Sequence, residues 1–171
     1  MSISEKNLIT LEFDKILEQL TSFTESETVR KKILTLEPFG TLSDAKNAQR
    51  ETTEAVNTCL KLGNPPVNFS VHDVTASVKR SEIGGILNPR DLMSVSRVLY
   101  VARRIKGYLA DSGEDAEILH SLGDAIIPDK PLEDRINSAI LSETEIADDA
   151  SADLSAIRRK MNALNAKIKE S

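Results

Sequence analysis

Apolar residues recur along this chain at helical spacing, and no window alternates strongly enough to predict a strand. The first pattern is the i, i+3, i+4, i+7 stripe of one buried helical face: Phe13, Ile16, Leu17 and Leu20. We expect Thr10 to cap that helix, and Thr24 and Glu27 to form a capping box for a second helix. A third helix is predicted from about Ser43 to Leu62, and Gly63 follows it as a stop signal.

The middle of the chain predicts a central helix. Asn88, Pro89 and Asp91 give three agreeing start signals, namely an Asn cap, proline at the first helical position and an acid in the first turn. The helix that follows, to about Leu109, carries apolar residues around much of its circumference. Such a wide apolar arc implies neighbours on more than one side, so we expect this helix to lie centrally.

Glycine and proline divide the rest of the chain into shorter pieces. Gly84 and Gly85 stand between two isoleucines and predict a tight turn with positive φ or a close backbone approach. Shorter helices are expected near residues 73–78, 115–125 and 132–140, whereas residues 141–147 fit either a short strand or a loop. We therefore predict an all-α fold, in which an irregular multi-helix bundle occupies residues 1–150.

The last segment, residues 151–171, has a different pattern. Its apolar residues recur at spacings of 3, 4, 3 and 4, and they form a row that we call the seam: Leu154, Ile157, Met161, Leu164 and Ile168. This heptad spacing is typical of a coiled coil, so we predict a protruding helical arm. The seam continues to the end of the chain, and we therefore expect the chain to be a piece of a longer protein that can self-associate through the unfinished seam.

Composition excludes several kinds of site. A single cysteine, Cys59, leaves no internal disulfide and no thiolate-built metal site within one chain, and two histidines argue against a His-rich one. With four Phe, two Tyr and no Trp, little is available for stacking nucleic-acid bases. No phosphate-loop motif is present, and no apolar run approaches the roughly 18 residues that a membrane span needs. We expect a cytoplasmic protein that has no membrane partner.

The remaining acidic and histidine candidates each have a structural explanation that we favour. His72 followed by Asp73 resembles the metal-binding pair of phosphohydrolases, but no further histidine stands upstream, so a loop histidine beside a capping acid fits better. Asp148, Asp149 and Asp153 fit either a carboxylate metal cluster or the acid-rich start of a helix, and we prefer the helix start. We predict no catalytic residue, cofactor site or metal site in this chain.

Two groups of basic residues are candidates for nucleic-acid contact. For the group on the central helix, a solvated face with ion pairs inside the chain fits better: Arg97, Arg103, Arg104 and Lys106. Arg158, Arg159 and Lys160 lie on the arm, where residues 153–171 hold five basic side chains against two acidic ones in a chain of formal charge −5. Arg and Lys provide the salt-dependent part of nucleic-acid binding, so a phosphate contact is open here. The alternative is a solvated helix face with ion pairs inside the chain.

Four sequence blocks together resemble a known family. They are LEFDKIL at residues 11–17, ETTEA with GNPP at 51–66, HDV with KRSEIGGIL and DL at 72–92, and IADDAS at 146–151. In this order they are similar to the N-terminal region of the second bacterial branch of the MutS family, which lacks the mismatch-recognition domain. One departure is Ala152, where the family pattern has proline in the first turn of the final helix.

The resemblance implies a non-catalytic core, or lever, domain of a MutS-like ATPase. Residues 151–171 would be the base of an outgoing helix, and the seam would pair with a returning helix of the same protein. For the parent protein it implies a homodimer that uses ATP and Mg²⁺ and has a further domain of endonuclease character. It also implies suppression of homologous recombination by DNA binding, and splitting of collided ribosomes, with every active site outside this chain.

The pattern of the residues also fits a protein of another class. The chain could be a free-standing helical interaction module whose heptad arm binds a partner protein. A reading frame that continues past Ser171 into an ATPase domain would distinguish the lever from the module.

Overall fold

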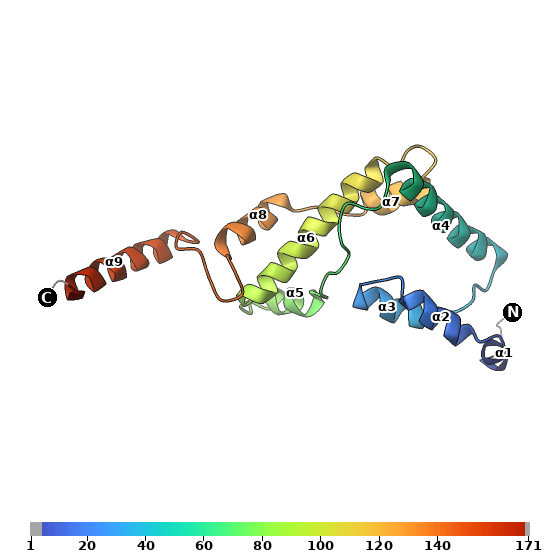
Figure 1. Ribbon diagram of the computed structural model, residues 1–171, viewed down its shortest axis with the longest axis horizontal. Helices are drawn as coiled ribbons and strands as arrows, with labels where there is room; N and C mark the ends of the chain where they lie inside the picture. Colours follow the sequence, from blue (N-terminus) through green and yellow to red (C-terminus); the bar gives the residue numbers. More distant parts are fainter. Residues whose placement is uncertain (1–4, 170–171) are drawn as a thin grey trace. The chain divides into compact units, whose positions relative to one another are not determined.

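A computed structural model describes residues 5–169, and within this range the regular elements are helices joined by turns and loops, with no strand. The helices are α1 (Glu5–Thr10), α2 (Phe13–Thr21), α3 (Glu27–Leu34), α4 (Leu42–Leu62), α5 (Thr75–Glu82), α6 (Pro89–Ala110), α7 (Glu117–Asp124), α8 (Lys130–Ala139) and α9 (Ala152–Lys169), shown in Figure 1. The all-α prediction is confirmed. Ile146, in the segment that fitted a strand or a loop, forms one isolated antiparallel bridge with Ile140, which directly precedes that segment.

The helices belong to two compact units. Within the described range, the first unit holds residues 5–73 and 101–128, and the second holds residues 74–100 and 129–169. The boundary falls inside α6, between Tyr100 and Val101. The division that the sequence predicts at residue 150 is a different one, because it separates the helical core from the arm. That division stays a prediction. No helix among residues 5–169 combines the length and apolarity of a membrane span.

Two of the predicted helix caps are displaced in the first unit. Thr10 is the last residue of α1, and Glu12, with a left-handed φ of 54°, precedes α2 instead. The cap of α3 is Ser26 rather than Thr24, because Ser26 adjoins the first turn and its Oγ accepts from the Val29 backbone N–H at 3.4 Å. Both helices form where predicted, so the error lies in the choice of capping residue.

The predicted buried stripe on α2 is covered only in part. Leu17 is buried and Phe13 is half-buried, whereas Ile16 is 56% exposed and Leu20 is 43% exposed. The helices that pack against α2 are α1 and α3. The sequence marks an apolar face correctly, but the described part of the chain does not bury all of it.

The glycine and asparagine signals around α4 and α6 are confirmed. Gly63 ends α4 with φ of 80°, and Gly84 forms the turn after α5 with φ of 79°. Gly85 shows the close backbone approach that was the second possibility for this glycine pair, since a Cβ there would lie 2.8 Å from the Arg80 carbonyl oxygen. At the start of α6, Asn88 Oδ1 accepts from the Asp91 backbone N–H at 2.8 Å.

A buried glutamate connects α4 to α7 in the first unit. The carboxylate Oε2 of Glu54 accepts hydrogen bonds from the backbone N–H groups of Ile118 at 2.8 Å and Leu119 at 3.2 Å. The residue before α7, Ala116, has no side chain that could cap this helix. Glu54 therefore supplies from α4 the cap that the local sequence of α7 lacks.

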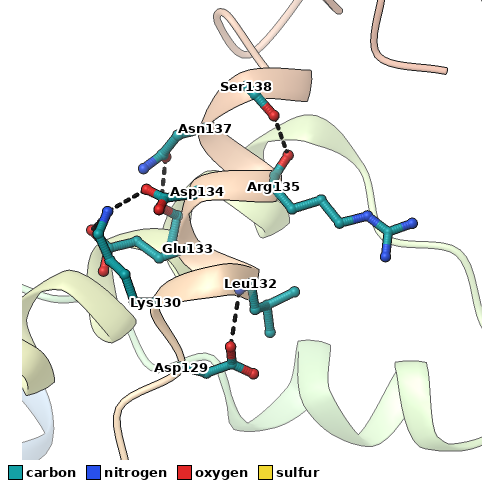
Figure 2. Close-up of polar contacts among 9 residues, drawn as sticks. Asp129, Lys130, Leu132, Glu133, Asp134, Arg135, Asn137 and Ser138 are labelled. Atoms are coloured by element: carbon teal, nitrogen blue, oxygen red, sulfur yellow. Dashed lines mark hydrogen bonds and ion pairs between the residues drawn. The ribbon is translucent and has the colours of Figure 1, made fainter.

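Polar contacts fix α8 in the second unit (Figure 2). Asp129 caps the helix by accepting from the Leu132 backbone N–H at 2.9 Å. Lys130 pairs with Asp134, and its Nζ lies 3.7 Å from the buried carboxylate of Glu133. Asn137 accepts from the Ser96 hydroxyl of α6 at 2.6 Å. These bonds attach α8 to the first half of α6.

Candidate partner-binding site on α9

A closed turn, which we call the elbow (residues 140–150), carries the chain from α8 to α9. The Ala147 backbone N–H donates to the Ala139 carbonyl at 2.9 Å, and the Leu141 N–H donates to the Glu145 carbonyl at 3.0 Å. Ala147 is also one of the few buried apolar residues of the second unit. The elbow is therefore hydrogen-bonded back onto the end of α8.

The first turn of α9 is set by its own sequence. Ser151 Oγ accepts from the Leu154 backbone N–H at 3.1 Å, and Asp153 lies in the first turn, where the positive end of the helix dipole favours an acid. The helix begins at Ala152, so alanine is accommodated at the position where the family pattern has proline.

Arg158 ties α9 to the elbow. Its Nη1 donates to the Ile146 carbonyl at 3.1 Å and pairs with the Asp148 carboxylate. Because Ile146 is itself bridged to Ile140, the guanidinium connects the second turn of α9 with the end of α8. Arg158 is thus engaged within the chain, and sequence reasoning missed this anchoring role. The signal available in the sequence was an acidic residue, Asp148, ten positions upstream of Arg158.

The three predicted basic contacts do not share one surface. Consecutive residues of an α-helix point about 100° apart, so Arg158, Arg159 and Lys160 are spread around much of the circumference. Arg159 donates through Nε to the Ser155 carbonyl at 3.3 Å, along the helix, and Lys160 is exposed. Phosphate contact by this trio stays a prediction, and it would engage the side chains separately.

The seam, by contrast, forms a continuous row on α9. Leu154 is half-buried near the elbow, and the four seam residues beyond it become more exposed toward the end of the helix: Ile157 at 55%, Met161 at 55%, Leu164 at 60% and Ile168 at 73%. An exposed apolar row of this length is a candidate surface for a partner, and pairing through the seam stays a prediction.

In the first unit, three side chains that could carry chemistry have partners within the chain: Cys59, Tyr108 and His120. His120 Nε2 lies 2.9 Å from the Gly113 carbonyl oxygen, next to the α6–α7 turn. Tyr108, which sequence reasoning did not single out, donates to the Gly63 carbonyl at 2.6 Å and lies 3.7 Å from Cys59 Sγ. Burial, followed by the hydrogen bond and charge of Cys59, raises the pKa of Tyr108 to about 12. These contacts join the end of α4 to α6.

Known proteins match this chain along nearly all of its length. Endonuclease MutS2 of Ruminiclostridium cellulolyticum is 38% identical over 170 residues, which are 98% of this chain. The chain is homologous to a segment of MutS2. Endonuclease MutS2 of Acetivibrio thermocellus is 37% identical and that of Alkaliphilus oremlandii is 35% identical, each over 98% of the chain. The resemblance to the second bacterial MutS branch is confirmed.

The match to MutS2 covers a limited part of those proteins. The chain spans about a fifth of the length of the curated relatives, with 21% covered in each of the three. No family model matches the chain. The endonuclease activity in the relatives' name belongs to those whole proteins.

Proposed function

We propose that this chain is a non-catalytic core, or lever, segment of a MutS2-type protein that acts on nucleic acid. The observation that carries the proposal is the match to Endonuclease MutS2 proteins over 98% of the chain. In this proposal α9 is the base of an outgoing helix, the seam meets a returning helix of the same protein, and movement of an ATPase domain reaches a clamp through α9.

The elbow supports the mechanical part of the proposal. A helix transmits rotation only if its base cannot swivel, and rigid elements with fixed joints are the usual carriers of such motion. At the base of α9, Arg158 binds both the Ile146 carbonyl and Asp148, while the Ala147 N–H is bonded to the last residue of α8. These bonds give α9 a defined direction relative to α8.

For the whole protein we propose the activities that the family resemblance implies. They are ATP-driven and Mg²⁺-dependent, in a homodimer, and comprise suppression of recombination through DNA binding and splitting of collided ribosomes in the cytoplasm. The endonuclease centre would lie outside this chain. The printed name of the relatives supports an action on nucleic acid in general and does not choose between DNA and ribosomal RNA.

The exposed seam favours a second candidate, a free-standing interaction module. A module needs only an apolar face for its partner, and four seam residues are more than half exposed. The two candidates differ in what they require of the elbow, because a lever needs a stiff joint and a binding arm does not.

Distances measured across the elbow test the proposal. We would place spin labels at Arg135 on α8 and Asn162 on α9, in a Cys59→Ser background, and record the distance distribution. We expect a narrow distribution that broadens in Arg158→Gln, which loses the Asp148 pair, and stays narrow in the matched variant Arg159→Gln. A broad distribution before any change at Arg158 would contradict the lever and favour the module.

A further inference from the structure

We infer that α1 and α2 form a two-state joint at Glu12, which is bent in this structure and is poised to straighten into one continuous helix. The inference follows from the backbone conformation of Glu12, from the residues on either side of it, and from the apolar spacing across the joint. It does not rest on the proposed function, because it concerns the first two helices and neither α9 nor the seam.

The backbone of Glu12 has a conformation that its side chain disfavours. Among the non-glycine residues in the range 5–169, Glu12 alone has a positive φ, at 54°, with ψ at 36°. This is the left-handed region, which residues at helix ends commonly adopt when they are glycine. In other residues Cβ then comes too close to the following carbonyl oxygen, so the conformation is strained. The bend therefore stores strain that glycine at this position would not have.

The local sequence does not require the bend. Residues 5–21 contain neither glycine nor proline, so the segment has no intrinsic helix breaker. The Glu12 side chain makes no cap hydrogen bond to α2. It pairs with Lys15, but this pair is exposed and its partners are three residues apart, a spacing that a continuous helix provides as well. The ion pair is compatible with both forms and does not hold the bend.

Few backbone hydrogen bonds distinguish the bent form from a straight one. The Leu11 N–H donates to the Asn7 carbonyl at 3.0 Å, four residues back as in an α-helix. The Ile16 N–H donates in the same way to the Glu12 carbonyl at 3.3 Å. Between them, the Glu12 N–H donates to the Ile9 carbonyl at 3.1 Å, only three residues back. Straightening would therefore alter the backbone locally, and it would give the first amides of α2 the intrahelical partners that a separate helix start lacks.

The apolar spacing across the joint fits one helix. Spacings of 4, 3 and 4 would align a single row along a continuous helix: Ile9, Phe13, Ile16 and Leu20. In the bent form Ile9 is 69% exposed and Ile16 is 56% exposed. The bend in turn lets α1 pack against α2, which opposes straightening. The joint thus sets whether this apolar row runs unbroken along one helix.

Spin labels across the joint test the inference on the full chain. We would place them at Lys6 and Glu18, which are both exposed, in a Cys59→Ser background, and record the distance distribution. In a continuous helix the two backbone positions would be about 18 Å apart, and the bend brings them closer. Glu12→Val should raise the population near that longer distance, because a β-branched residue disfavours positive φ further. Glu12→Gly should lower the ratio of straight to bent chains by about 5- to 30-fold and leave the shorter distance.

Urea unfolding with a matched glycine control tests the strain without labels. Glu12→Gly should raise the folding equilibrium constant by about 2- to 5-fold, because the release of the left-handed strain exceeds the extra chain entropy of glycine. Glu18→Gly, inside α2, should lower that constant by about 2- to 5-fold, since its backbone is already helical. Loss of stability in both glycine variants would show that Glu12 stores no strain and would overturn the inference.

The distance measurement has its own contradicting result. A single short distance in Glu12→Val, with helicity by circular dichroism unchanged, would mean that packing fixes the bend and that the straight form does not exist. A population near 18 Å that is present in Glu12→Val and absent in Glu12→Gly would establish the two states. If Glu12→Val loses its helicity, the two glycine variants decide. None of these results bears on α9, so the lever proposal is tested separately.

Discussion

Replacing Glu54 should weaken the attachment of α7 to α4 more than any other single acidic substitution in α4. Its Oε2 accepts from two backbone N–H groups, those of Ile118 and Leu119, at 2.8 and 3.2 Å, and its side chain is only 9% exposed. Arg50 Nη2 lies 3.7 Å from the other carboxylate oxygen but is 60% exposed. The first turn of α7 has no local substitute, because Ala116 precedes it.

The magnitude follows from these two bonds. Hydrogen bonds to a charged group contribute about 1.5–3 kcal/mol each, and a buried donor left without an acceptor costs about 1–3 kcal/mol. The solvent-exposed Arg50 pair adds less than about 1 kcal/mol. Glu54→Gln keeps an acceptor oxygen and should lower the free energy of unfolding by about 1–2 kcal/mol. Glu54→Ala removes the acceptor and should lower it by about 3–5 kcal/mol.

Urea denaturation followed by circular dichroism measures the loss of unfolding free energy. Faster hydrogen exchange of the Ile118 and Leu119 amides would show that the loss arises at the start of α7. Each kcal/mol should also lower the Tm by about 2–4 °C in a chain of this size. Glu51→Ala, on the same helix but exposed, is the matched control and should change stability by less than about 0.5 kcal/mol. Equal losses of unfolding free energy in Glu51→Ala and Glu54→Ala, with unchanged hydrogen exchange of the Ile118 and Leu119 amides, would refute the conclusion that Glu54 caps α7.

Three further predictions concern the α4–α6 contact and the glycine turns. The folded chain keeps the Tyr108 proton up to its raised pKa of about 12, whereas the unfolded chain releases it near pH 10. The free energy of unfolding in urea should therefore fall as the pH rises from about 10 to 12, and Tyr108→Phe should flatten that fall. Cys59→Ala should lower the pKa of Tyr108, as followed by tyrosinate absorbance, since the thiol is one of the groups that raise it. Gly85→Ala should cost about 1–3 kcal/mol in urea unfolding, because the new Cβ would lie 2.8 Å from the Arg80 carbonyl oxygen, while Gly40→Ala, with open space around it, should cost little.

Helix positions could be predicted from the sequence because their signals are local. The Asn88 cap and the Gly63 stop act on the backbone within four residues of themselves, so they hold whatever else the chain contacts. The same holds for the helix at the seam, whose cap, Ser151, directly precedes it. The capping error at Thr24 arose where a second capable residue, Ser26, stood two positions away, whereas at Thr10 the chain instead enters α2 through Glu12, which makes no side-chain cap.

Burial and pairing could not be predicted, because they depend on residues far along the chain. Glu54 looks like a solvent-facing acid beside two threonines, and its burial is decided by α7, 64 residues later. Ile16 and Leu20 look like core residues, yet their exposure depends on which helices reach α2. At the candidate site, the heptad spacing revealed the seam, whereas the anchoring of Arg158 needed the folded elbow to bring Asp148 close.

Sedimentation of this chain, with and without duplex DNA and structured RNA at low and moderate salt, tests the central claim most directly. A lever segment whose seam awaits a helix should bind nucleic acid weakly or not at all at moderate salt. Any self-association should disappear in the double variant Met161→Lys, Leu164→Lys, which places two charges in the seam. Tight, sequence-tolerant binding that persists at moderate salt would contradict this account and would make the core itself a nucleic-acid-binding domain.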